Sequence, residues 1–205
     1  MVNNRLDLEH GWDFVTPQQV QPRKWPSVDG QPVVWETCQS MNGSWGYERD
    51  SGSWKSVDQL VRMLIDTVSK GGNLLLNVAP TGRGEFDQLT LERLAGIGDW
   101  MHAHNRSIYG CSAAPAEFAT PQDCRLTYNP NTHRLYVHVF AWPFSRLFID
   151  GLGDRVEYAQ LLNDASEIVI ADPRPEEQAG NTLALALAVQ QPNVAVPVIE
   201  LFLKP

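Results

Sequence analysis

Residues 56–80 read SVDQLVRMLIDTVSKGGNLLLNVAP and predict an α-helix followed directly by a buried strand. In the first half, apolar residues recur at the i, i+3, i+4 and i+7 spacing of an amphipathic helix, and Ser56 with Gln59 forms a capping box at its start. Two consecutive glycines end this helix. Residues 73–80 are almost continuously apolar, which is typical of a parallel strand covered on both faces. The stretch therefore predicts an α/β unit with a parallel sheet.

The same succession of strand, loop and helix surrounds this stretch. Residues 33–38 predict a preceding strand, and residues 2–5 predict the end of an earlier one. After a loop at residues 81–84, a second helix is expected to run to Asn105. Its inward positions are expected to be Leu91, Leu94, Ile97 and Met101. Three strands and two helices do not close an eight-stranded barrel, which takes about 250 residues, so we expect residues 1–112 to be an incomplete part of one.

Beyond residue 112 the pattern changes to short strands separated by turns. Residues 134–141 alternate in the way that a strand with one buried face does. Further strands are expected at residues 155–162, 167–171, 182–189 and 198–203. This spacing indicates an antiparallel sandwich of about seven or eight strands. The predicted fold class is therefore α/β, with the C-terminal portion of a (β/α)8-type (TIM) barrel at residues 1–112 and an all-β antiparallel sandwich at residues 113–205.

The composition argues against several classes of protein. Lys and Arg number 16 against 24 for Asp and Glu, and the resulting net charge of -8 argues against a nucleic-acid partner, which needs a basic surface. No run approaches the roughly 20 apolar residues of a membrane span, and the first 14 residues contain no apolar core of the signal-peptide kind. There is no CxxC pair, P-loop or dinucleotide-binding motif, so we expect neither metal nor cofactor. The sequence leaves open a disulfide between Cys111 and Cys124.

Three residues stand out as candidates for a site, because active groups in parallel α/β folds lie at the carboxyl ends of strands and in the loops that follow. Glu36 is a carboxylate in an apolar strand, where burial costs several kcal/mol unless the group is paired or used. It either forms an ion pair with an arginine such as Arg5 or acts on substrate. Arg5, in turn, either forms a salt bridge inside the barrel or clamps a ligand. Trp45, in a Gly/Ser-rich loop, either stacks on the apolar face of a sugar or caps the barrel interior.

Four short motifs are familiar as a set: VNNR at residues 2–5, WETC at 35–38, SWGY at 44–47 and GGNLLLNVAP at 71–80. In this order and spacing they resemble the later part of the α-L-fucosidases of glycoside hydrolase family 29. The resemblance covers residues 2–112 and extends more loosely over the sandwich. It implies a retaining hydrolase that removes terminal α-L-fucose from a fucosylated oligosaccharide or glycoconjugate, without metal or cofactor. It also implies that the full-length parent protein is secreted, periplasmic or lysosomal.

The resemblance assigns roles to two of the three candidates. Arg5 corresponds to a ligand of the sugar hydroxyls, and Trp45 corresponds to part of the apolar wall that receives the fucose methyl group. The nucleophilic Asp of the family lies on a strand before the VNNR motif. We therefore expect the nucleophile to lie outside this chain, and we expect the chain alone to be inactive.

The acid/base residue follows less directly from the resemblance. Some members of the family carry a Glu where this chain has Gln18, in the stretch Thr16-Pro17-Gln18. An amide cannot give up a proton as a general acid. Since this position varies within the family, Glu36 remains the candidate acid/base, with Glu9 and Asp13 behind it.

Two alternatives to a fucosidase remain open at this stage. The chain could be a non-catalytic carbohydrate-binding or structural fragment, with the sandwich as its folded part. It could also belong to a different barrel glycosidase with a similar tail. In either case no nucleic acid or membrane partner is expected, and the open edge of the partial barrel invites association with another chain.

Overall fold

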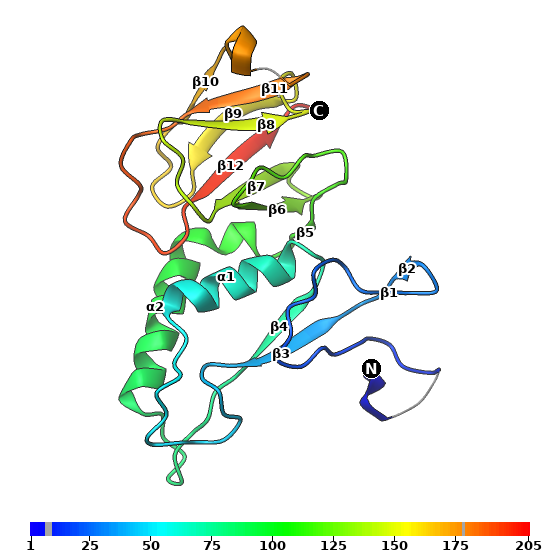
Figure 1. Cartoon of the computed structure of the whole chain (residues 1–205), viewed down its shortest axis with the longest axis vertical. Coiled ribbons are helices and arrows are strands. Elements are labelled where there is room, and N and C mark those ends of the chain that lie inside the picture. Colours follow the sequence, from blue (N-terminus) through cyan, green and yellow to red (C-terminus); the bar gives the residue numbers. More distant parts are fainter. Residues whose placement is uncertain (7–9, 178) are drawn as a thin grey trace. The chain divides into compact units, whose positions relative to one another are not determined.

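The computed structural model describes residues 1–6, 10–177 and 179–205, and these form two compact units, Met1–Asp99 and Trp100–Pro205 (Figure 1). The division falls within the helix α2 (Gln88–His104), earlier than the change of pattern at residue 112 suggests. The reason is that the end of α2 packs within the second unit, where the Trp100 indole Nε1 donates to the Val196 carbonyl at 2.9 Å.

The helix α1 (Val57–Val68) forms where the capping signals predict it. The Ser56 hydroxyl accepts from the Gln59 amide at 3.1 Å, and the Gln59 side chain accepts from the Ser56 amide at 2.8 Å. After the helix, Gly71 has a φ of +70°, a left-handed conformation that favours glycine. The chain can therefore turn at once into the next strand.

Parallel pairing of β3 (Glu36–Ser40) with β4 (Asn73–Asn77) organises the first unit. Two further segments continue the parallel pairing on the other side of β3 through the bridges Asn3–Phe14, Val15–Trp35 and Gln18–Cys38. The segment at residues 14–18 was not expected from the sequence, because it has no apolar run and is paired only through residues distant in the chain. The unit therefore has one more parallel segment than the three predicted.

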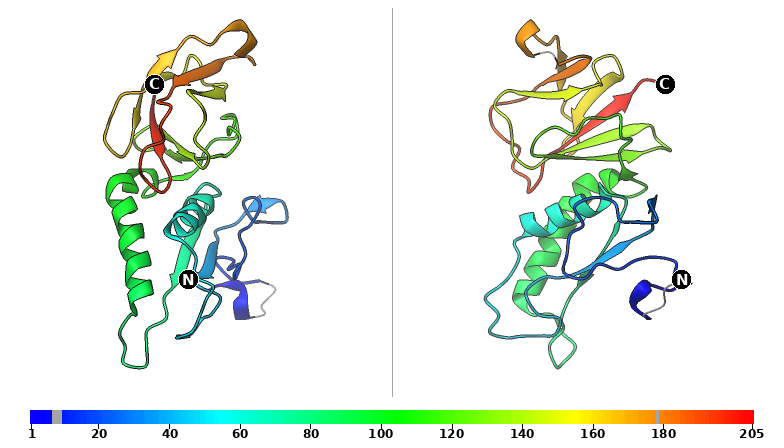
Figure 2. Two further views of the ribbon diagram at one scale, coloured as in Figure 1. Left: turned by 60° about the vertical axis from the view of Figure 1, so that its left-hand side comes forward. Right: turned by 45° about the vertical axis from the view of Figure 1, so that its right-hand side comes forward.

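Side chains alternate across this parallel set and divide it into a covered face and an uncovered face. Trp35 is fully buried, and its indole Nε1 donates to the Lys70 carbonyl at 2.9 Å just after α1. Thr37 and Gln39 share the face of Trp35 and are also buried. On the opposite face Leu75 is 49% exposed. Figure 2 shows α1 beside the β3–β4 pair.

The remaining elements of the first unit are short, apart from α2. They are the 3-10 turn η1 (Asn4–Leu6) and the hairpin of β1 (Ser27–Val28) with β2 (Gln31–Pro32). Along α2, Leu94 and Ile97 are partly buried as expected, but Leu91 is 48% exposed, so its predicted inward position is wrong. Gly96 of α2 lies so close to Val57 that a Cβ atom there would clash with the valine side chain, which places α2 against the start of α1.

Two antiparallel sheets make up the second unit, as the alternating pattern predicts. The larger has the order β5-β6-β7-β12-β9 and the smaller the order β10-β11-β8. Their bounds are β5 (Ser112–Ala113), β6 (Cys124–Asn129), β7 (Arg134–Val139), β8 (Arg146–Asp150), β9 (Val156–Leu161), β10 (Val169–Ala171), β11 (Thr182–Ala186) and β12 (Val198–Leu203), with the 3-10 turns η2 (Asn105–Ser107) and η3 (Pro175–Glu177).

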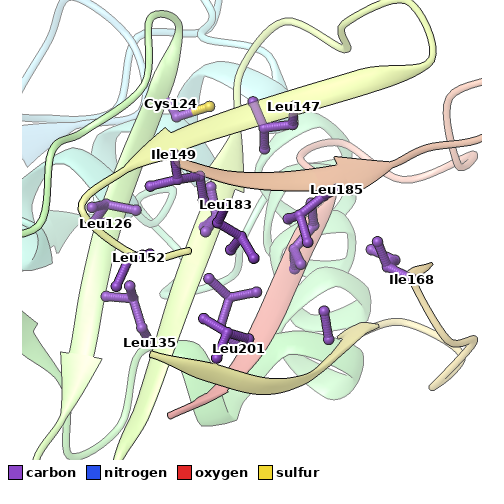
Figure 3. Close-up of a cluster of buried hydrophobic side chains, with 14 of the residues drawn as sticks. Cys124, Leu126, Leu135, Leu147, Ile149, Leu152, Ile168, Leu183, Leu185 and Leu201 are labelled. Carbon is purple, nitrogen blue, oxygen red and sulfur yellow. The ribbon is translucent and has the colours of Figure 1, made fainter. Parts of the chain in front are cut away.

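The two sheets enclose one hydrophobic core (Figure 3). Ile149 and Leu183 come from the smaller sheet, and Leu135 and Leu201 come from the larger one. All four are at most 1% exposed. Burying side chains of this size stabilises a fold by about 1.5–3 kcal/mol each, so the sandwich has its own source of stability.

The outer face of the larger sheet is unusual in being buried and polar. His138 Nε2 hydrogen-bonds to the Thr127 hydroxyl at 2.9 Å, and His104 Nδ1 hydrogen-bonds to the Trp100 carbonyl at 2.8 Å. Neither of the remaining ring nitrogens, His104 Nε2 and His138 Nδ1, has a hydrogen-bond partner among the described residues. Burial, together with the neighbouring His104, lowers the pKa of His138 to about 3. The pKa of His104 is also lowered, mainly by burial.

We predict that the second unit loses stability as the pH falls below about 6.5. The unfolded chain binds a proton at His138 near pH 6.5 whereas the folded chain binds it only near pH 3, so protons favour unfolding across that interval. Between pH 7 and pH 5 this residue should lower the free energy of unfolding by about 2 kcal/mol. Urea titrations followed by the Leu201 methyl signal measure the effect. A His138→Gln chain with the same pH dependence would contradict it.

In the first unit we predict that Gly72→Ala is strongly destabilising. A Cβ atom at residue 72 would overlap the buried Trp35 ring, whereas Gly46 has open space around the corresponding position. Gly72→Ala should lower the free energy of unfolding by about 1–3 kcal/mol, and the control Gly46→Ala by less than about 0.5 kcal/mol. The Ile65 methyl signal, followed in a urea titration, reports the unfolding of this unit. Equal effects of the two substitutions would contradict the packing described here.

Candidate active site

The Arg5 guanidinium is held in a fixed position at the end of the first parallel segment. Its Nε donates to the Thr16 hydroxyl at 2.6 Å, and its Nη2 donates to the Thr16 carbonyl at 3.1 Å. Its Nη1 donates to the Gln18 side-chain oxygen Oε1. The Asn4 side chain in turn accepts from the Thr16 amide at 3.0 Å. Three donors of one arginine are thus directed by the neighbouring segment, which orients the guanidinium while leaving it exposed.

Glu36 lies level with this arrangement, on the same face of the parallel set. Because Val15 pairs with Trp35 and Gln18 with Cys38, Thr16 is in register with Glu36. Side chains in register in neighbouring parallel strands point to the same face. Thr16, Gln18 and Glu36 therefore share the uncovered face, away from the buried Trp35.

The Glu36 carboxylate has no ion pair or side-chain hydrogen bond within the described part of the chain. Arg5 donates to Thr16 and Gln18 instead, so the ion pair between Glu36 and Arg5, one of the two alternatives from the sequence, does not form. Glu36 is only partly buried, which keeps its carboxylate accessible from the uncovered face. A carboxylate in this setting is free to act on a ligand.

Trp45 lies at the carboxyl end of β3, in a loop held by the next strand. The Asn77 side chain, at the last residue of β4, donates to the Trp45 carbonyl at 2.9 Å. At the far end of the loop, the Lys55 ammonium donates to the Ser40 carbonyl at 2.5 Å, and burial lowers the pKa of Lys55. The Trp45 side chain is 40% exposed, so part of the indole can contact a ligand. The loops after β3 and β4 leave the sheet at the same end (Figures 1 and 2).

The structure brings Arg5 and Glu36 to one face but places Trp45 farther along. Glu36 begins β3, whereas Trp45 follows its last residue, Ser40. Four strand residues span roughly 13 Å, which separates Glu36 from the start of the loop that carries Trp45. The parallel segments are staggered, since Arg5 ends its segment at the level where β3 begins.

The lesser candidates have other roles or are not described. Asp13 accepts from the Val2 amide at 2.6 Å, which ties it to the start of the chain rather than to Glu36. Glu9 lies outside the described residues. Cys111 and Cys124 are free thiols, so the disulfide left open by the sequence does not form. Burial raises the pKa of Cys111 to about 11 and that of Cys124 to about 12, so both thiols stay protonated.

No group of three or more His, Cys, Asp or Glu side chains in residues 1–6, 10–177 and 179–205 could hold a metal ion. None of the helices in this part of the chain has the length and apolar character needed to cross a membrane.

The residues that hold Arg5 and Trp45 in place are not identified by the sequence. The sequence identifies Gln18 only as an amide that cannot act as the acid, and it gives no sign that Thr16 is a partner of Arg5. Recognising residues 14–18 as a strand would have placed Thr16 and Gln18 on one face by alternation alone. The anchoring of Trp45 by Asn77 depends on the folding of the loop and has no signal in the sequence.

Comparison with known proteins identifies the family of this chain. The family model described as alpha-L-fucosidase matches residues 1–106, which is more than half of the chain. The chain belongs to the α-L-fucosidase family. The alternative of a different barrel glycosidase with a similar tail is therefore wrong.

Relatives and solved structures agree with this assignment. The plasma α-L-fucosidase of Homo sapiens is 35% identical over 124 residues, which are 58% of this chain and 26% of that protein. The α-L-fucosidase isoenzyme 1 of Paenibacillus thiaminolyticus matches 94% of this chain and 45% of its own, with a TM-score of 0.86 and 37% identity.

The Thermotoga maritima α-fucosidase, solved with a mechanism-based inhibitor, matches 98% of this chain and 45% of its own, with a TM-score of 0.76 and 30% identity. The same enzyme has been solved with fucose. The chain thus spans less than half the length of these three α-L-fucosidases.

We predict that Asn77→Ala loosens the loop that carries Trp45. The substitution removes the side-chain donor to the Trp45 carbonyl, and a hydrogen bond of this kind contributes about 0.5–1.5 kcal/mol. Tryptic cleavage at Arg49, within this loop, should become about 2- to 10-fold faster. Asn193→Ala, at an exposed position of the second unit, is the matched control. Unchanged cleavage in Asn77→Ala would show that the loop is held by other contacts.

Proposed function

We propose that this chain is the C-terminal portion of a retaining α-L-fucosidase with a (β/α)8 barrel, acting on terminal α-L-fucose of a fucosylated oligosaccharide or glycoconjugate. The observation that carries the proposal is the exposed Arg5 guanidinium, oriented by Thr16 and Gln18 on the same face as Glu36. Membership in the family supports the fucose specificity. Four parallel segments with one uncovered face fit consecutive strands of a barrel whose interior is that face.

Each site residue has a role in this proposal. Arg5 donates hydrogen bonds to hydroxyl oxygens of the fucose and fixes its orientation. The exposed part of the Trp45 indole contacts the apolar side of the sugar that carries the methyl group. Glu36, which has no ion pair or side-chain hydrogen bond among the described residues, acts as the general acid and base.

In the reaction that we propose, two displacements occur at the anomeric carbon. An Asp nucleophile, expected outside this chain, forms a bond to the anomeric carbon while the glycosidic C–O bond breaks. Glu36 gives its proton to the departing oxygen. In the second step Glu36 takes a proton from water, whose oxygen attacks the anomeric carbon and releases the Asp carboxylate. The pair of carboxyl groups needs to lie about 5–5.5 Å apart for this outcome.

A non-catalytic role for the second unit is the alternative that has structural support. The sandwich is a compact unit with its own core and therefore meets the requirements for folding independently of the site. In that case the chain acts as a carbohydrate-binding or structural fragment. Loss of all fucose binding in the first unit, with a folded sandwich retained, would favour this alternative.

We predict that the chain alone does not hydrolyse phenyl α-L-fucoside in plain buffer. The two-step route depends on a nucleophile that is expected elsewhere, and added azide should replace it and restore release of phenol. Steady release without azide would contradict the placement of the nucleophile, because a carboxylate within the chain would then have to attack.

In the same assay, Glu36→Gln should lower the azide-dependent rate by roughly 10²- to 10⁴-fold, since phenol is a poor leaving group that needs a proton. Glu167→Gln, at an exposed position of the second unit, should leave this rate unchanged. An unaffected rate in Glu36→Gln would remove Glu36 from the mechanism without excluding fucosidase chemistry.

A further inference from the structure

The contact between Arg5 and Gln18 determines which way the Gln18 amide faces. An arginine side chain carries only hydrogen-bond donors, so the atom that it meets on Gln18 must be the acceptor oxygen. Arg5 Nη1 accordingly donates to Gln18 Oε1. The two N–H bonds of Gln18 Nε2 are therefore directed away from the guanidinium.

These two donors are available to a ligand. Gln18 is exposed, and its Nε2 has no partner within residues 1–6, 10–177 and 179–205. The residue pairs in register with Cys38, so it lies on the uncovered face, two positions along from Thr16 and Glu36. A free amide donor next to an oriented guanidinium favours an oxygen acceptor with lone pairs, such as a sugar hydroxyl, and disfavours a cation.

We propose that Gln18 is a substrate-binding residue, whose Nε2 donates a hydrogen bond to a hydroxyl oxygen of the fucose bound by Arg5. This inference rests on the proposed fucosidase function. It assigns the Gln18 amide a role in binding, beyond its being unable to act as the acid in place of a Glu. A carboxylate at residue 18 would pair with Arg5 and present no donor to the sugar, so the change from amide to acid would weaken binding.

Titration of the intact chain with L-fucose, followed by ¹H–¹⁵N NMR, tests this directly. The side-chain amide signal of Gln18 is assigned by its loss in Gln18→Ala, and the Trp45 indole and Arg5 Nε signals report the proposed fucose site independently. We expect all three signals to shift along one binding curve. Gln18→Ala and Gln18→Glu should each weaken fucose binding by about 2- to 10-fold, as expected for one lost hydrogen bond. Gln190→Ala, exposed in the second unit, is the control.

The possible outcomes separate the two proposals. Shifts at Trp45 and Arg5 without a shift at Gln18, or unchanged affinity in both Gln18 variants, would overturn the role of Gln18 and leave the proposed function standing. No shift at any of the three signals would overturn both. Weaker binding in Gln18→Ala but not in Gln18→Glu would also contradict the inference, because it would show that residue 18 serves as an acceptor.

Discussion

The buried Trp35 ring is the contact on which the first unit depends. Its indole donates to the Lys70 carbonyl, and its ring lies directly against Gly72, where no Cβ atom can be accommodated. This contact joins the end of α1 to the start of β3 and thereby determines which face of β3 is covered. Glu36, the next residue, must point to the other face. The accessible carboxylate is thus a consequence of burying the tryptophan before it.

Backbone hydrogen bonds between β3 and residues 14–18 bring distant parts of the chain together at the candidate site. The Glu36 amide donates to the Val15 carbonyl and the Cys38 amide to the Pro17 carbonyl, both at 3.0 Å. These bonds put Thr16 and Gln18 on the face of Glu36, and both residues then hold Arg5. A guanidinium and a carboxylate are therefore presented on one face without being paired with each other.

Local features of the fold could be predicted from the sequence, and features that depend on pairing could not. The capping box and apolar stripe of α1 lie within one turn or one face of a helix, so the sequence contains them fully. Residues 14–18 lack such a pattern, and their pairing partners lie 11 to 20 positions away along the chain. For the candidate site, residue types and motifs single out Arg5, Glu36 and Trp45, whose roles stay predictions. The roles of Thr16, Gln18 and Asn77 depend on register and on loop folding.

Amide hydrogen exchange at Glu36 and Cys38 tests most directly whether the backbone hydrogen bonds between β3 and residues 14–18 organise the site. Their amides donate to Val15 and Pro17, so the account predicts that both exchange slowly and as a single unit together with the Asn73 amide, which donates to the Trp35 carbonyl. Exchange at Glu36 and Cys38 at the rate of an unfolded peptide, with Asn73 still protected, would contradict the account. In that case residues 14–18 would not pair with β3, and Arg5 and Gln18 would not be held on the face of Glu36.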